Sequence, residues 1–184
     1  MINDRIIWPK HYDPAKADIN VEAEATAEGI TAEELWPYLT NISDIQKLVH
    51  EVVDAEPLDP NTDDPHLYPK EEFTIDTTEF TAHFRVLEAI PPKGDRVGRI
   101  TWDGEATPKQ GGKPMRIIHA WVLEVEKGEK LNVLSAFSVT GNAVSADYFD
   151  AFNRKWVNAL VKYTIGKETH TNHPRHPSSG AMVK

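Results

Sequence analysis

Hydrophobic residues in the last third of the chain recur at the spacing of an α-helix. Between residues 143 and 166 they follow one another at intervals of three and four, as Phe149, Phe152, Trp156, Leu160 and Tyr163. This spacing places them on one face of a helix. Ser145, or Asn142 just before it, is a suitable N-cap, and Gly166 is a suitable terminator. The sequence therefore predicts a long helix over 143–166 whose aromatic face packs against a large apolar surface.

The residues before this helix alternate between apolar and polar side chains, as β-strands do. Residues 18–27 predict a half-buried strand. Further strands are predicted at about 50–57, 70–77, 79–89, 96–105, 115–126 and 130–140. The segments between the later strands carry the Gly, Pro and Asp residues that tight turns need. An antiparallel meander, one strand following the next, is the expected arrangement.

Two short helices are predicted after the first strand. Thr31 and Glu34 have the spacing of a capping box, and Ile30 can contact Leu35 across the first turn. Pro37 limits this helix to a short piece. A second short helix is expected at about 42–49. The order of elements predicts an α+β domain at residues 18–166, with an irregular arm at 1–17 and a flexible tail at 167–184.

Composition excludes several classes of function. The formal net charge is −9 and no basic stripe is evident, so we expect neither nucleic acid nor an anionic membrane surface as the main partner. The chain has no cysteine, which excludes disulfides and thiolate chemistry. No segment reaches the roughly 20 apolar residues needed to span a bilayer. No secretion signal is evident at the N-terminus, so a cytoplasmic location is expected. The sequence leaves the oligomeric state open.

Several local motifs resemble the START-like (SRPBCC) helix-grip superfamily, which includes polyketide cyclases/dehydrases, plant hormone binders and lipid carriers. The resemblance covers about residues 18–166, and the motifs that carry it are Thr31–Trp36, Trp102-Asp103-Gly104, His119-Ala120-Trp121, Phe137–Gly141 and Phe152…Trp156…Leu160. All of them are scaffold features, and none is a catalytic signature. Two departures are Lys47-Leu48-Val49, where an aromatic residue commonly ends the second short helix, and a long loop at residues 57–69.

The resemblance implies a helix-grip fold, in which a curved antiparallel sheet of six or seven strands wraps around the C-terminal helix. It also implies that an internal cavity binds a small hydrophobic molecule, polyketide-like or aromatic. The natural chemistry would be cofactor-free cyclisation, dehydration or isomerisation. One alternative is a non-catalytic carrier or sensor of such a ligand. The other is a partner-binding module with a filled core, which the acidic composition permits but no exposed apolar stripe supports.

His119 is the leading candidate for chemistry, because strand alternation places it on an otherwise apolar face. It is either a general acid/base or carbonyl donor, or a core histidine satisfied by a neighbouring group. Arg99 and Asp103 share a strand face and form either a buried pair, if a bulge near Gly98 turns them inward, or an exposed one. Tyr68 is either a lid residue or a loop tyrosine packed on its neighbours.

The expected ligand-contacting residues are aromatic: Phe84, Trp102, Trp121, Phe137, Phe149, Phe152 and Trp156. No glycine-rich phosphate loop and no zinc triad spacing occurs, so we expect no cofactor and no metal. The tract His170, His173 and His176 can bind metals weakly, but a solvated tail is the simpler interpretation.

Overall fold

The structure is a computed structural model that describes residues 3–126 and 130–171, the last two by their backbone only. It contains one seven-stranded sheet and three α-helices. The strands are β1 (Ile19–Ala27), β2 (Val52–Pro57), β3 (Glu72–Thr77), β4 (Phe80–Ile90), β5 (Gly98–Pro108), β6 (Met115–Glu126) and β7 (Lys130–Thr140). The helices are α1 (Ala32–Thr40), α2 (Ile45–Leu48) and α3 (Ala146–Thr171), with 3-10 turns at Pro14–Lys16 and Ile42–Asp44.

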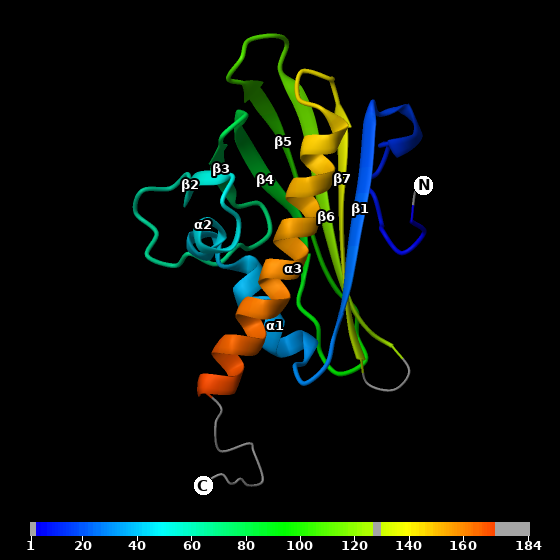
Figure 1. Ribbon diagram of the computed structural model, residues 1–184, viewed down its shortest axis with the longest axis vertical. Coiled ribbons are helices and arrows are strands. Elements are labelled where there is room, and N and C mark those ends of the chain that lie inside the picture. The colour runs from blue at the N-terminus through cyan, green and yellow to red at the C-terminus, as the bar shows by residue number, and fades with distance from the viewer. Residues whose placement is uncertain (1–2, 127–129, 172–184) are drawn as a thin grey trace, which may run out of the picture.

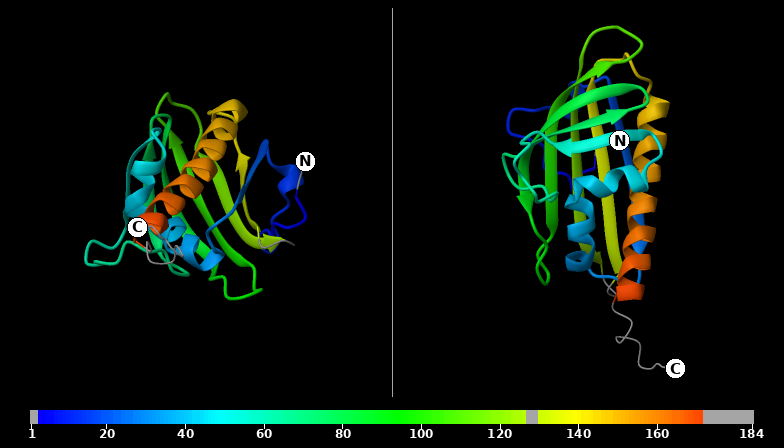
Figure 2. Two further views of the ribbon diagram at one scale, coloured as in Figure 1. Left: turned by 60° about the horizontal axis from the view of Figure 1, so that its bottom comes forward. Right: turned by 90° about the vertical axis from the view of Figure 1, so that its left-hand side faces the viewer.

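The sheet is antiparallel throughout and has the order β1-β7-β6-β5-β4-β3-β2. From β2 to β7 each strand pairs with the next in sequence, which is the predicted meander, and β1 closes the order beside β7. The sheet curves around α3, which lies along its concave side, while α1 and α2 lie near the C-terminal half of α3 (Figures 1 and 2). This arrangement confirms the predicted fold class. Within the described residues, no helix has the length and apolar character that crossing a membrane requires.

The capping signals in the sequence are used as predicted. Thr31 and Glu34 form a reciprocal capping box at the start of α1. Ser145, one of the two N-cap candidates for α3, accepts a hydrogen bond on its side chain from the backbone N–H of Tyr148 at 3.2 Å. These contacts satisfy backbone donors that a helix start otherwise leaves free.

The predicted end of α3 at Gly166 is wrong, because the helix continues to Thr171. Gly166 has no positive φ angle, so it does not adopt the left-handed conformation of a terminator. A contact outside the helix supports the extra turn. The hydroxyl of Tyr38 on α1 donates a hydrogen bond to Glu168 at 2.7 Å. Tertiary contact therefore overrides the tendency of glycine to end a helix.

The N-terminal arm packs on the convex face of the sheet, which the sequence did not indicate. Ile6 is buried there in an apolar cluster, with Trp8 packed against its edge. The sheet contributes the small and branched side chains Ala120, Val122, Leu134 and Ala136. The central strands are therefore buried on both faces, by α3 on one side and by the arm on the other.

Candidate functional site

The candidate site lies between the concave face of the sheet and α3. Its centre is His119 on β6, whose side chain is fully buried. The His119 ring stacks on Phe137 with a centroid separation of 3.8 Å, and Trp102 and Trp156 each approach it to 4.9 Å. Trp121 lies at 5.2 Å. The histidine is thus enclosed by aromatic rings from three strands and from α3.

All seven aromatic residues predicted to contact a ligand lie in this interior. Phe84, Trp102, Trp121, Phe137, Phe149, Phe152 and Trp156 are each at most 3% exposed. They also contact one another: Phe152 stacks on Trp156 at 5.6 Å, and Phe137 stacks on Phe152 at 5.7 Å. The space where the sequence predicts a cavity is therefore occupied by the protein's own rings. We call this group, together with His119, the aromatic centre.

A chain of buried polar groups connects the aromatic centre to α3. Nε2 of His119 lies 2.7 Å from Oγ of Ser135 on β7. The Ser135 hydroxyl donates to Oδ1 of Asn153 at 2.7 Å, and Nδ2 of Asn153 donates to the Ser135 carbonyl at 2.8 Å. All three side chains are fully buried.

These hydrogen bonds determine which ring nitrogen of His119 carries the proton. The Ser135 carbonyl can only accept, so Asn153 must turn its amide nitrogen toward it and its oxygen toward the Ser135 hydroxyl. The single hydroxyl proton is then used, and Ser135 Oγ must accept from His119 Nε2–H. Burial lowers the pKa of His119 well below 6.5, so the ring is neutral. Its Nδ1 consequently carries a lone pair, and this atom has no hydrogen-bond partner among the described residues.

Three further nitrogen atoms in the aromatic centre are buried without a partner in the described part of the chain. They are the indole Nε1 atoms of Trp102, Trp121 and Trp156, each of which is a hydrogen-bond donor. The rings that carry them are neighbours, with Trp156 5.5 Å from Trp121 and 6.1 Å from Trp102. The aromatic centre thus combines three unused donors with one unused acceptor.

Arg99 and Asp103 lie on the opposite, convex side of the sheet. The β5–β6 ladder runs in continuous register from Gly98 to Ala106, so no bulge turns them inward. Asp103 accepts two hydrogen bonds from Arg116, at 3.0 and 2.8 Å, and Arg99 donates to the backbone oxygen of Arg5 at 2.6 Å. The structure therefore pairs neither residue with the other, and it brings neither together with His119.

Tyr68 is 55% exposed and belongs to a separate pocket at one end of the sheet. This pocket has a volume of about 310 Å³ and is mainly apolar. Its wall is formed by α1, by the loop at residues 57–69, which we call the proline loop, and by the end of β4. The lining residues are Trp36, Pro37, Thr40, His66, Leu67, Tyr68, Pro69, Ala89 and Pro91.

Sequence reasoning missed His66, Asp64 and Asn153. Asn153 follows Phe149 by four positions and precedes Trp156 by three, so a polar residue on the predicted apolar face was the available signal. Asp64, His66 and Tyr68 alternate along the loop, and the structure joins them by hydrogen bonds. A loop has no fixed side-chain period, so this grouping had no reliable signal in the sequence.

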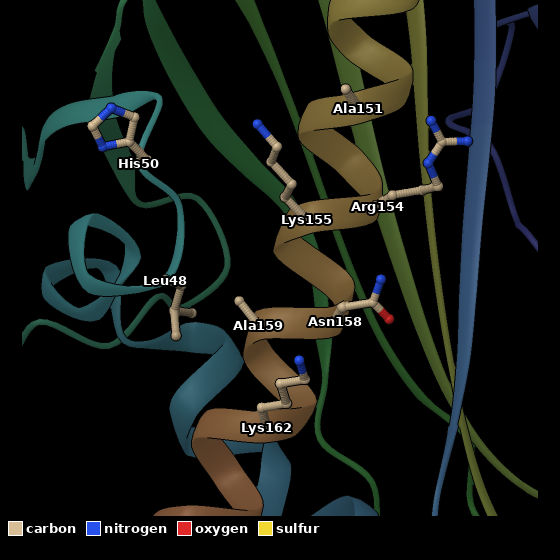
Figure 3. A pocket seen from close by; sticks show the side chains of 8 residues that line it. All are labelled: Leu48, His50, Ala151, Arg154, Lys155, Asn158, Ala159 and Lys162. Atoms are coloured by element: carbon tan, nitrogen blue, oxygen red, sulfur yellow. The ribbon is translucent and has the colours of Figure 1, made fainter.

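A wider groove of about 570 Å³ follows the outer face of α3. In Figure 3, Lys155 points from α3 toward the side of the groove that carries His50, whereas Arg154 points to the other side of the helix. Lys155 is paired with Glu51 at 2.5 Å and Arg154 with Asp150 at 2.8 Å. Most of the positive charge that lines the groove is thereby neutralised by a neighbouring carboxylate, and the groove is open to solvent.

Metal ligands do not gather in the described residues, where no group of three or more His, Cys, Asp or Glu side chains could hold an ion. The tract at His170, His173 and His176 lies outside the side chains that the structure describes.

Comparison with known proteins finds similarity at the level of structure. No protein-family model matches the chain, and no curated protein matches its sequence. A hypothetical protein, jhp0584 from Helicobacter pylori, superposes with a TM-score of 0.74 at 23% identity, over 89% of this chain and 98% of its own. The Zhui aromatase/cyclase from Streptomyces sp. R1128 gives 0.56 at 14% identity, over 82% and 94%. Ara h 8.0201 gives 0.53 at 14% identity, over 80% and 97%. These likenesses establish the fold.

Proposed function

We propose that this chain, which has the helix-grip fold of the START-like superfamily, binds a small hydrophobic molecule in the aromatic centre. The proposed ligand is aromatic or polyketide-like and carries both carbonyl and hydroxyl oxygens. The observation that carries the proposal is a set of four buried nitrogen atoms, at Trp102, His119, Trp121 and Trp156, that have no hydrogen-bond partner among the residues the structure describes.

Stability alone does not account for these nitrogen atoms. A buried donor or acceptor without a partner costs about 1–3 kcal/mol, and buried indole N–H groups usually have one. Phenylalanine would supply a similar ring without that cost. Four such atoms in neighbouring rings therefore favour a polar guest in this region.

The chemistry of the guest follows from the polarity of the four atoms. Indole N–H groups donate and so favour carbonyl oxygens, while Nδ1 of neutral His119 accepts and so favours a hydroxyl group. The surrounding rings favour a flat apolar body. Because the rings now fill the interior, the guest must displace some of them, and its binding would shift the population toward this rearranged state.

A binding measurement tests the proposal. Titration calorimetry with 2,6-dihydroxyanthraquinone should show binding by the wild-type chain, and Trp156→Phe should weaken it by about 5-fold or more through loss of one donor. Trp8→Phe is the matched control, because the buried indole nitrogen of Trp8, on the convex side, also lacks a partner in the described part of the chain. No binding by the wild type, or equal weakening by both variants, would contradict the proposal.

Catalysis is the second candidate, and one observation favours it. His119 is neutral with a free lone pair, so it can act as a general base, while the indole N–H groups beside it could stabilise a developing oxyanion. Cofactor-free cyclisation, dehydration or isomerisation of a bound polyketide-like chain would suit this arrangement. Arg99 and Asp103 lie too far away, across the sheet, to take part directly, and Tyr68 lies at the separate pocket.

The two candidates are separated by one variant. His119→Gln keeps a hydrogen-bonding side chain near Ser135 but removes the imidazole base. If the protein is an enzyme, a poly-β-ketone probe should be converted by the wild type and left unchanged by this variant, with binding retained within a few-fold. A carrier would leave the probe unchanged in both proteins, as judged by mass spectrometry.

A further inference from the structure

We infer that the pocket beneath the proline loop is a second binding site, for a small planar aromatic molecule with a hydroxyl group that donates a hydrogen bond to Nε2 of His66. This site lies outside the aromatic centre, and the inference does not depend on ligand binding there. It rests on three features of the pocket: its fixed walls, its apolar lining and the polarity of His66.

Backbone hydrogen bonds hold the walls together. The N–H of Leu67 donates to the Thr40 carbonyl at 2.9 Å, and the N–H of Ile42 donates to Pro65 at 3.0 Å. On the other side of the loop, the N–H of Lys70 donates to the Val86 carbonyl of β4 at 2.8 Å. The proline loop is thus tied both to the end of α1 and to the sheet. A pocket with fixed walls binds a ligand at a low entropic cost.

The lining is suited to a flat ring. Trp36, Pro37, Leu67 and Pro69 supply apolar surface, and Ala89 leaves space at the end of β4. A volume of about 310 Å³ lies at the lower end of the range of small-ligand sites. The two polar side chains of its rim that bear on specificity are His66 and Tyr68.

Asp64 sets the hydrogen-bonding character of both rim residues. One carboxylate oxygen accepts from the backbone N–H of His66 at 2.9 Å and lies 2.8 Å from its Nδ1, and the other accepts from the Tyr68 hydroxyl at 2.7 Å. These hydrogen bonds, the backbone one first, lower the pKa of Asp64 to about 2, so the carboxylate is charged at neutral pH. A charged carboxylate only accepts, so Nδ1 of His66 must carry the proton.

The free nitrogen of His66 is therefore an acceptor when the ring is neutral. No partner for Nε2 occurs among the described residues. The Tyr68 hydroxyl proton is already donated to Asp64. The rim thus favours a ligand that donates, such as a phenol or an enol, over one that only accepts.

A pair of probes tests this polarity. 2-Naphthol and 2-methoxynaphthalene share one ring system, but only the first can donate a hydrogen bond. The wild-type chain at pH 8 should bind 2-naphthol about 5-fold more tightly, the usual value of one neutral hydrogen bond. His66→Phe should abolish the preference, and its melting temperature checks that the variant folds, because this side chain is only 36% exposed. Equal affinities in the wild type, or no binding of either probe, would overturn the inference.

The location is tested separately. Ala89→Trp should fill the pocket and weaken both probes at least 10-fold, with the melting temperature as a check on folding. Histidine ring signals in NMR distinguish the two sites: 2-naphthol should shift the signal of His66 and leave that of His119 in place. A shift of His119 alone would place the probe in the aromatic centre and would overturn the assignment to this pocket. The failure of 2,6-dihydroxyanthraquinone to bind, by contrast, would bear only on the aromatic centre.

Discussion

His119 is a polar residue that the fold keeps uncharged. Ser135 and Asn153 supply its hydrogen bond, and the surrounding rings remove it from water. Strand alternation alone placed it on the apolar face, and the structure confirms that placement. Which ring nitrogen carries the proton depends on Ser135 and Asn153, which lie on β7 and α3. The sequence of β6 alone could therefore not predict it.

Acid should weaken the fold through His119. Its pKa is lowered by burial, whereas the unfolded chain takes up a proton below about pH 6.5. Below that pH the unfolded state binds more protons than the folded state, so the free energy of unfolding falls, by at most about 1.4 kcal/mol per pH unit from this group. Urea denaturation at pH 7, 6 and 5 should show a smaller decline for His119→Gln than for the wild type. Parallel declines would contradict the prediction.

Trp156 should be the most costly aromatic residue of α3 to remove. It is 1% exposed and contacts His119, Trp102, Trp121 and Phe152. Trp156→Ala should lower the free energy of unfolding by about 3–5 kcal/mol, because the cavity left behind cannot collapse fully. Trp156→Phe retains a ring and should cost much less. Urea unfolding of both variants checks this, and equal losses would show that ring volume is not the cause.

At the scale of elements, the predicted strands match the observed ones to within a few residues, because β3 and β4 alternate clearly and turn residues separate the later strands. The helices could be predicted from their capping residues and from the spacing of their apolar residues. The end of α3 escaped prediction, since it depends on the contact between Tyr38 and Glu168 rather than on Gly166. Local sequence patterns thus predict which elements form, whereas contacts between elements determine the residues at which they end.

The capping box of α1 offers a test at this scale. Thr31→Ala removes the side-chain acceptor for the Glu34 backbone N–H at 3.0 Å and should cost about 1 kcal/mol. Thr31→Ser retains the hydroxyl and should stay within a few tenths of the wild type. Thermal or urea unfolding measures both. A serine variant as unstable as the alanine variant would show that the methyl group, and not the cap, matters.

At the scale of the whole molecule, the resemblance to the helix-grip superfamily predicted the curved sheet around a long helix, but local patterns predicted neither the filling of the interior nor the covering of the convex face. Whether rings from four strands and a helix leave a cavity depends on how they interdigitate, which no single strand reveals. The arm lacks a regular period, so its docking through Ile6 and Trp8 had no signal.

Docking of the arm can be tested with two neighbouring residues. Ile6 is 5% exposed and Ile7 59%. Ile6→Asp should release the arm, because it places a charge against Ala120 and Leu134, and limited proteolysis should then cut residues 3–17 several-fold faster. Ile7→Asp should leave the rate near that of the wild type. Equal rates in both variants would show that the arm is not held by this cluster.

The strand order makes β1 and β2 the two edge strands of an open sheet. Glu22 and Glu24 lie on the first, and Asp54 and Glu56 on the second. If a second copy paired one of its edge strands with β1 or β2, carboxylates of the two copies would come together and repel each other. Each whole chain also carries a net charge of −9. Edge-to-edge growth of fibres from the native state is thereby opposed.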